Sequence, residues 1–151
     1  MRQMTLRLIE KYQRPVVKLT NFHGLDAMID TGALYPVWMA GEGQIRRIGG
    51  TKKIENVEFG GLGGMTQGSL YELSHFQIGD LIFPNMNIIV HKSDFPVPML
   101  LPATMFESLI YEINNKTHRL NIVVPDDESI SRNLKIRSEN GQLYIFCSST
   151  K

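Results

Sequence analysis

Cysteine is nearly absent from this sequence: Cys147 is the only one among 151 residues. A single cysteine cannot form a disulfide within the chain, which excludes the disulfide-stapled folds of small secreted proteins and favours a reducing compartment. The sequence also lacks an apolar run of the roughly 20 residues that cross a membrane, and its cationic first residues contain no apolar signal-peptide core. We therefore expect a cytoplasmic protein that does not bind a membrane.

An excess of charge of one sign is missing as well. The sequence has 16 Lys and Arg against 15 Asp and Glu, for a net charge of +1, and its basic residues are scattered. Nucleic-acid-binding proteins usually concentrate basic residues in a patch or stripe. Nucleic acid is therefore not expected as a partner.

Several chemical signatures are also missing. The histidines show no paired spacing typical of zinc ligands, so no metal site is predicted; they are His23, His75, His91 and His118. No Gly-x-Ser-x-Gly elbow occurs, and no nucleophile motif surrounds Cys147, which we interpret as a small core residue. A phosphate-binding loop is disfavoured because the glycine-rich run at 60–64 is followed by an alternating stretch instead of Gly-Lys-Ser/Thr and a helix.

What the sequence does contain is a series of short strand-like runs. At 151 residues and 42% hydrophobic, it suits one compact domain with a core. The alternating, β-branched stretch Pro15–Asp30, with Gly24 at its turn, predicts a hairpin. Further strand-like runs at residues 52–59, 68–78, 80–90 and 117–124 complete a mainly β pattern.

One helix and a second hairpin are predicted near the C-terminus. A helix is expected over about 104–114, with Thr104 as its N-cap, because apolar residues recur at helical spacing at Phe106, Leu109, Ile110 and Ile113. The dipeptide Asn140-Gly141 between alternating runs is a strong hairpin signal. A polar connection at 125–133 precedes that C-terminal hairpin.

The triplet Asp30-Thr31-Gly32 directly follows the apolar run Ala27–Ile29. A carboxylate at the end of a buried strand costs desolvation energy unless hydrogen bonds or a shared proton stabilise it. A hydroxyl and a residue without Cβ, placed next to it, can hold the neighbouring backbone and allow close approach. An ordinary strand-to-turn transition is the alternative, since Asp and Gly are common turn residues.

A glycine-rich segment lies between the strand-like runs 52–59 and 68–78. Gly60, Gly61, Gly63 and Gly64 flank Leu62. This composition predicts a hairpin whose tip bends freely and offers one apolar contact, so that it can cover a ligand. A merely flexible surface hairpin is the alternative interpretation.

Taken together and in this order, these segments resemble the retropepsin-like aspartic peptidases, the single-domain family that includes the retroviral proteases. The resemblance spans about residues 15–124 and rests on "DTGA", a downstream "GGLGG" and the apolar strand "PMLL". It implies a closed β-barrel half with one short helix, with the chain 1–151 forming a single domain. Residues 125–151 lie beyond the matched span and are candidates for a dimer interface.

The resemblance implies a homodimeric aspartic endopeptidase that cleaves polypeptides without a metal or an organic cofactor. Asp30 is then the catalytic aspartate, Thr31 bonds across the dimer, and substrate backbone passes Gly32. Because each chain has one triplet, one chain supplies half a site. The residues implied in substrate binding are Ala33, Leu34, Val37, Gly60, Gly61, Leu62, Gly63 and Gly64.

Three positions depart from the family pattern. Pro102 stands where the family has a glycine before its helix, and a proline fixes φ and cannot donate a backbone hydrogen bond. Leu34 and Ala103 stand where retroviral members carry an acidic residue and its arginine partner. These departures support the alternative of a non-catalytic dimerisation or peptide-binding module with the same fold.

Overall fold

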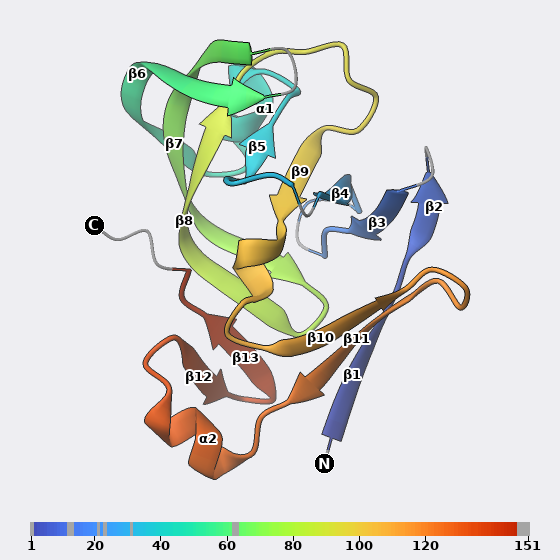
Figure 1. Ribbon diagram of the computed structural model, residues 1–151. Helices are drawn as coiled ribbons and strands as arrows, with labels where there is room; N and C mark the ends of the chain where they lie inside the picture. The colour runs from blue at the N-terminus through green and yellow to red at the C-terminus, as the bar shows by residue number, and fades with distance from the viewer. Residues whose placement is uncertain are drawn as a thin grey trace.

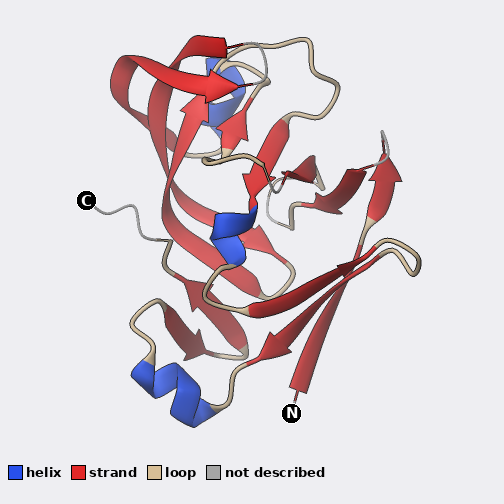
Figure 2. Ribbon diagram, in the orientation of Figure 1, coloured by secondary structure: helices blue, strands red, loops and turns tan. Residues whose placement is uncertain are grey.

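Figure 1 shows the computed structural model of the chain, which describes residues 2–11, 14–20, 22, 24–30, 32–61 and 64–147. Strands dominate, as Figure 2 shows, so the mainly β prediction is confirmed. The strands are β1 (Arg2–Arg7), β2 (Ile9–Lys11), β3 (Arg14–Lys18), β4 (Asp26–Asp30), β5 (Val37–Trp38), β6 (Gly50–Gly61), β7 (Gly64–Ile78), β8 (Leu81–Val90), β9 (Met99–Pro102), β10 (Ile110–Asn114), β11 (Arg119–Val124), β12 (Ile136–Glu139) and β13 (Gln142–Ile145). The helices are α1 (Glu42–Arg47), α2 (Asp127–Arg132) and the 3₁₀ helix η1 (Ala103–Phe106).

The strands form two sheets. The smaller sheet has the order β1-β11-β10. The larger, ten-stranded sheet runs β12-β13-β8-β5-β9-β4-β3-β2, with β7 pairing β8 and β6 pairing β7. Among the described strands, β12 and β2 end this order and do not pair with each other, so the expected closed barrel is instead an open sheet that bends around the core.

Strand β4 lies inside the larger sheet, between two partners. It pairs antiparallel with β3 and parallel with β9, which confirms the predicted hairpin Pro15–Asp30. The side chains of Ala27 and Ile29 belong to the main core cluster, whereas Met28 packs in a smaller cluster with Val16. Because β4 is buried on both faces, its sequence is apolar from Ala27 to Ile29, between Asp26 and Asp30 at its two ends.

The predicted hairpin around the glycine-rich segment is also present. Strands β6 and β7 pair antiparallel from Gly50↔Leu73 to Gly61↔Gly64. The second part of β7 continues past β6 and pairs with β8 from Ser69↔Val90 to Ile78↔Leu81. One long strand therefore joins the hairpin to the body of the sheet, as Figure 1 shows in green.

The predicted helix over 104–114 is wrong. The chain forms the short η1 over Ala103–Phe106 and then the strand β10, which pairs with β11 from Ile110↔Val123 to Asn114↔Arg119. Leu109, Tyr111 and Ile113 alternate inward while Ile110 is 72% exposed. The apolar spacing suited both a helix and a strand, and β-branched residues together with the nearby partner β11 favour the strand.

The C-terminal hairpin β12–β13 is confirmed, with Asn140 and Gly141 both at positive φ, 53° and 81°. It joins the larger sheet because β13 pairs parallel with β8 at Leu143↔Leu81 and Tyr144↔Ile82. The predicted polar connection before it contains α2, whose N-cap Asp126 accepts a hydrogen bond from the Ser129 N–H at 2.8 Å. None of the helices in the described part of the chain has the length and apolar character that a membrane crossing requires.

Gly68 allows the β6–β7 hairpin to approach β8. A Cβ at this position would lie 2.8 Å from the Val90 carbonyl oxygen and 3.2 Å from the Phe59 ring. Because the nearest atom belongs to the backbone of β8, it cannot move aside without disturbing the strand pairing.

We predict that Gly68→Ala lowers the free energy of unfolding by about 1–3 kcal/mol, because the methyl group overpacks this contact. Gly43→Ala is the matched control: it lies in α1 with nothing within 4 Å of an added Cβ, and alanine there should stabilise by about 0.5–1 kcal/mol. Urea unfolding measures the change in the free energy of unfolding for both variants. Equal effects of the two substitutions would contradict the close approach at Gly68.

Candidate functional site

Asp30 ends β4 and is half-buried. Its Oδ1 accepts a hydrogen bond from the Gly32 N–H at 3.0 Å, and its carbonyl oxygen accepts one from the Ala33 N–H at 3.0 Å. The backbone therefore turns around the carboxylate directly after the strand. Such a turn holds the side chain in one orientation at the open end of a buried strand.

The loop that follows presents large apolar side chains to solvent. Leu34 is 74% exposed and Tyr35 is 53% exposed. Val37, by contrast, is buried in β5 and pairs with Ile89 of β8 and Leu100 of β9. The exposed positions are therefore the ones in this loop that are free to contact a ligand.

Pro102 lies beside Asp30, because the parallel register of β4 and β9 places the two residues opposite each other. Its backbone is extended, with φ −78° and ψ 152°, and the next residue begins η1. A proline is compatible with this position since its fixed φ matches an extended residue before a helical turn. The departure from glycine is thus accommodated without disturbing the strand that flanks Asp30.

A cleft of about 600 Å³ begins at this strand end. It is lined by four regions: the loop after Asp30, the strands β6 to β8, η1, and the segment around the C-terminal hairpin. Its residues are Leu34, Tyr35, Pro36, Val57, Glu58, Leu70, Met86, Asn87, Ile89, Pro102, Thr104, Met105, Glu107, Lys135 and Cys147. This volume lies within the roughly 300–1,000 Å³ of ligand pockets, and the lining is mostly apolar with polar groups at few points.

The structure brings together only part of the residues that the sequence indicated. Leu34 lines the cleft, whereas Asp30, Gly32, Ala33 and Val37 do not. Thr31, Leu62 and Gly63 lie outside the described residues, as does His23. The remaining glycines of the predicted set, Gly60, Gly61 and Gly64, lie at the end of the β6–β7 hairpin and are not among the lining residues.

Most of the cleft was missed from the sequence. Val57 and Leu70 carry a weak signal, since both belong to alternating stretches of the predicted hairpin. Met86, Met105 and Cys147 come from segments far apart in the sequence and meet only through the fold. No local pattern marks them, because their shared surface depends on how the sheet bends.

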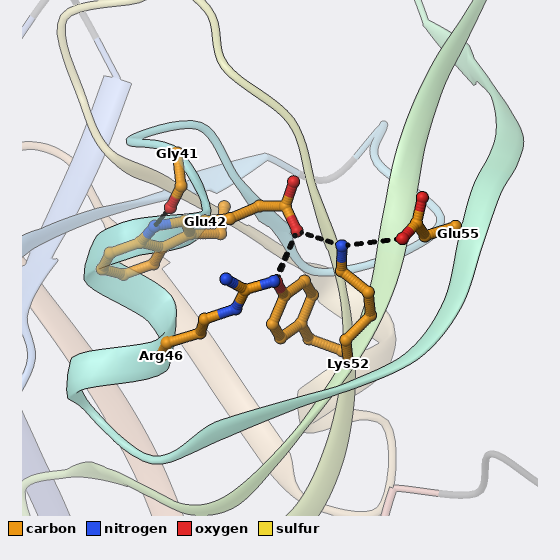
Figure 3. A network of polar contacts seen from close by, with 7 residues as sticks. Gly41, Glu42, Arg46, Lys52 and Glu55 are labelled. Atoms are coloured by element: carbon orange, nitrogen blue, oxygen red, sulfur yellow. Dashed lines mark hydrogen bonds and ion pairs between the residues drawn. The ribbon is translucent and has the colours of Figure 1, made fainter.

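A polar cluster fastens α1 to the base of the β6–β7 hairpin (Figure 3). The Glu42 carboxylate accepts a hydrogen bond from the Tyr71 hydroxyl at 2.5 Å and pairs with Lys52 Nζ at 2.8 Å. Arg46 lies 3.6 Å from the same carboxylate, and Lys52 also pairs with Glu55 at 3.3 Å. The bonds from Lys52 and Tyr71 hold the pKa of the Glu42 carboxyl below its usual range.

The other reactive side chains have ordinary structural roles. Burial raises the pKa of the Cys147 thiol to about 11, so it is almost wholly protonated at neutral pH and a poor nucleophile. The His91 ring packs on Phe59 with centroids 5.1 Å apart, and burial lowers its pKa. Within the described ranges, no three or more His, Cys, Asp or Glu side chains are grouped so as to hold a metal ion.

Comparison with known proteins identifies the fold. The structure is similar to the crystal structure of a retropepsin-like aspartic protease from Rickettsia conorii, with a TM-score of 0.55. The chain has a retropepsin-like fold. The match covers 80% of this chain and 89% of that chain at 16% sequence identity, so the likeness concerns the fold. No protein-family model and no curated protein sequence matches the chain.

We predict that Tyr71→Phe lowers the free energy of unfolding by about 1 kcal/mol at pH 7, because it removes one hydrogen bond while keeping the buried ring. Glu42→Gln should also destabilise at pH 7. Since folding lowers the pKa of Glu42 from its ordinary 4.5, the stabilisation is present above about pH 4.5 and is lost as the pH falls through the folded-state value.

Urea unfolding of wild type and Glu42→Gln at pH 7 and pH 3 tests this sign. The stability difference between the two proteins should be larger at pH 7 and shrink at pH 3. A difference that stays constant or grows on acidification would show that the Glu42 charge does not hold α1 to the hairpin.

Proposed function

We propose that the chain is a homodimeric aspartic endopeptidase in which two copies of Asp30, one from each subunit, activate a water molecule that attacks a peptide bond. The observation that carries this proposal is the position of Asp30: its carboxylate is held by the Gly32 N–H at the end of β4, opposite Pro102, which lines a cleft of about 600 Å³, in a retropepsin-like fold. Thr31 is assigned the bond between the two loops, and Gly32 the passage of substrate backbone.

Two Asp30 carboxylates brought together in a dimer would share one proton, because like charges at short distance disfavour double ionisation; aspartic proteases are the known example. The charged carboxylate then acts as general base on the water. The neutral carboxyl donates a hydrogen bond to the oxygen of the scissile carbonyl. Each subunit thus supplies one of two complementary roles.

The β6–β7 hairpin is proposed as the cover of the bound peptide. Its strands carry Val57, Glu58 and Leu70 into the cleft lining, so the hairpin already forms one side of the binding space. The glycine-rich end, from Gly60 to Gly64, would close over the substrate and exclude water around the reacting atoms. The substrate is expected to be an extended polypeptide with apolar side chains near the scissile bond.

One observation favours a non-catalytic module instead. Leu34 is 74% exposed where the resemblance implies a charged residue that grips the substrate backbone. An exposed apolar residue at that point also suits a surface that only binds a peptide or a second subunit. Both functions use the same cleft, but only the peptidase requires the Asp30 charge. A substitution that removes this charge therefore distinguishes the two functions.

We predict that the purified dimer cleaves peptides of a diverse library when assayed from about pH 4 to 7. Asp30→Asn keeps the shape of the side chain and removes its charge, so cleavage should fall to background while the unfolding midpoint changes little. Asp94→Asn, the same substitution on an exposed residue, is the matched control and should cleave as wild type does.

Mass spectrometry of the digests reads the result, and sedimentation shows whether the protein is dimeric at the assayed concentration. Cleavage that persists in Asp30→Asn would remove Asp30 from the mechanism. A dimer of the wild type that cuts no peptide would favour the non-catalytic module.

A further inference from the structure

We propose that the segment around the C-terminal hairpin, residues 133–147, forms one wall of the substrate cleft and gives it a preference for a large apolar side chain of the peptide. The inference rests on the proposed function in that the occupant is a peptide substrate. It concerns a part of the chain that lies beyond the span, about 15–124, on which the family resemblance rests.

The wall consists of the two ends of this segment. Lys135 precedes β12 and Cys147 follows β13, and both line the cleft together with Leu34 and Tyr35 of the loop after Asp30. The Phe146 N–H donates a hydrogen bond to the Lys135 carbonyl at 2.8 Å, so the two ends are tied to each other. The two lining residues of this segment therefore belong to one connected surface.

This surface is also joined to η1, whose residues Thr104 and Met105 line the same cleft. Lys135 Nζ lies 3.5 Å from Glu107 Oε1, and the Cys147 thiol lies 3.9 Å from the Met105 carbonyl oxygen. Figure 1 shows η1 between β9 and the C-terminal hairpin. Since Pro102 ends β9 beside Asp30 and directly precedes η1, a short continuous path leads from the carboxylate to the wall.

The hairpin holds the wall in a fixed position. Strand β13 pairs with β8, and the Leu143 N–H donates to the Asp80 carbonyl at 2.9 Å. Ile136, Leu143 and Ile145 are buried in the core of their own chain. These contacts use the apolar face of the hairpin within the subunit, which favours a wall of the cleft over the dimer interface that the sequence suggested.

The space in front of the wall suits a large apolar side chain. Leu70, Met86, Ile89 and Met105 line the cleft, as do Glu107 and Lys135, which pair with each other. Met86 and Met105 belong to the core cluster and also line the cleft. Because methionine side chains adapt their shape readily, a rotamer change at either residue can accommodate Phe, Leu or Met. Because the Glu107 and Lys135 charges pair with each other, the apolar lining residues are left to contact the substrate.

The test uses a substitution in the wall that makes the cleft narrower. Each protein carries Asp30→Asn to prevent turnover and is immobilised to retain peptides from a random octapeptide library, which are then sequenced. Cys147→Phe adds an aromatic ring at the wall. Ser138→Phe adds the same ring to the exposed side of the same hairpin, away from the cleft, and is the matched control.

We expect the Asp30→Asn protein and its Ser138→Phe variant to enrich Phe, Leu or Met at one peptide position. Cys147→Phe should reduce that enrichment by about tenfold in favour of Ala and Gly, because a large side chain no longer has room to bury its apolar surface. If Cys147→Phe does not fold, Lys135→Phe narrows the cleft from the other end of the same wall.

Unchanged enrichment in the wall variants, or no peptide retained by the folded Asp30→Asn protein, would overturn this inference. Cleavage by wild type is scored separately. If Cys147→Phe changes the residue preference of the retained peptides but wild type cleaves no peptide, the inference about the wall is supported and the peptidase proposal is rejected. If wild type cleaves peptides but the wall variants retain peptides with an unchanged residue preference, the peptidase proposal is supported and the inference about the wall is rejected.

Discussion

The burial of β4 between β3 and β9 is the constraint on which the rest of the structure depends. Both faces of the strand pack in apolar clusters, so its polar residue at the end, Asp30, must emerge where the core stops. The parallel partner β9 ends at the same level, at Pro102, and the chain turns away on both strands. A carboxylate, an exposed apolar loop and the start of η1 therefore meet at one edge of the sheet.

Around this edge, long strands bring distant parts of the chain to the same cleft. Strand β7 pairs with β6 at one end and with β8 at the other, so the hairpin that lines the cleft is continuous with the core. The Glu42 cluster fastens α1 to the base of that hairpin. These contacts hold the base of the hairpin against α1 and the body of the sheet.

Local signals predicted those parts of the fold that local interactions determine. The hairpin Pro15–Asp30 and the turn Asn140-Gly141 follow from alternation and from residues that tolerate positive φ. The segment 104–114 was misassigned because its apolar spacing suits both a helix and a strand, and the pairing with β11 decides between them. Helix α1 was missed because its Gly41 N-cap makes no side-chain hydrogen bond, and Glu42 instead contacts Tyr71 from a distant strand.

The candidate site also has one part that the local sequence predicts and one part that depends on the whole fold. Asp30 stands out in the sequence because a carboxylate directly follows an apolar strand, and the structure places it at a strand end with a bonded turn. The cleft is different, since Met86, Met105, Lys135 and Cys147 come from four separate segments. Which side chains share that surface depends on the bend of the sheet and the docking of the C-terminal hairpin on β8, and neither is a property of a short stretch of sequence.

The central claim is that one site needs two copies of Asp30. The most direct test mixes wild-type and Asp30→Asn chains in equal amounts, allows the subunits to exchange, and measures peptide cleavage at constant total protein. If both carboxylates of a homodimer are required, only wild-type pairs cleave, and activity should fall to about one quarter of that of pure wild type. Activity of about one half would mean that each Asp30 acts independently, and about three quarters that one Asp30 per dimer suffices; either result would contradict the requirement for two copies.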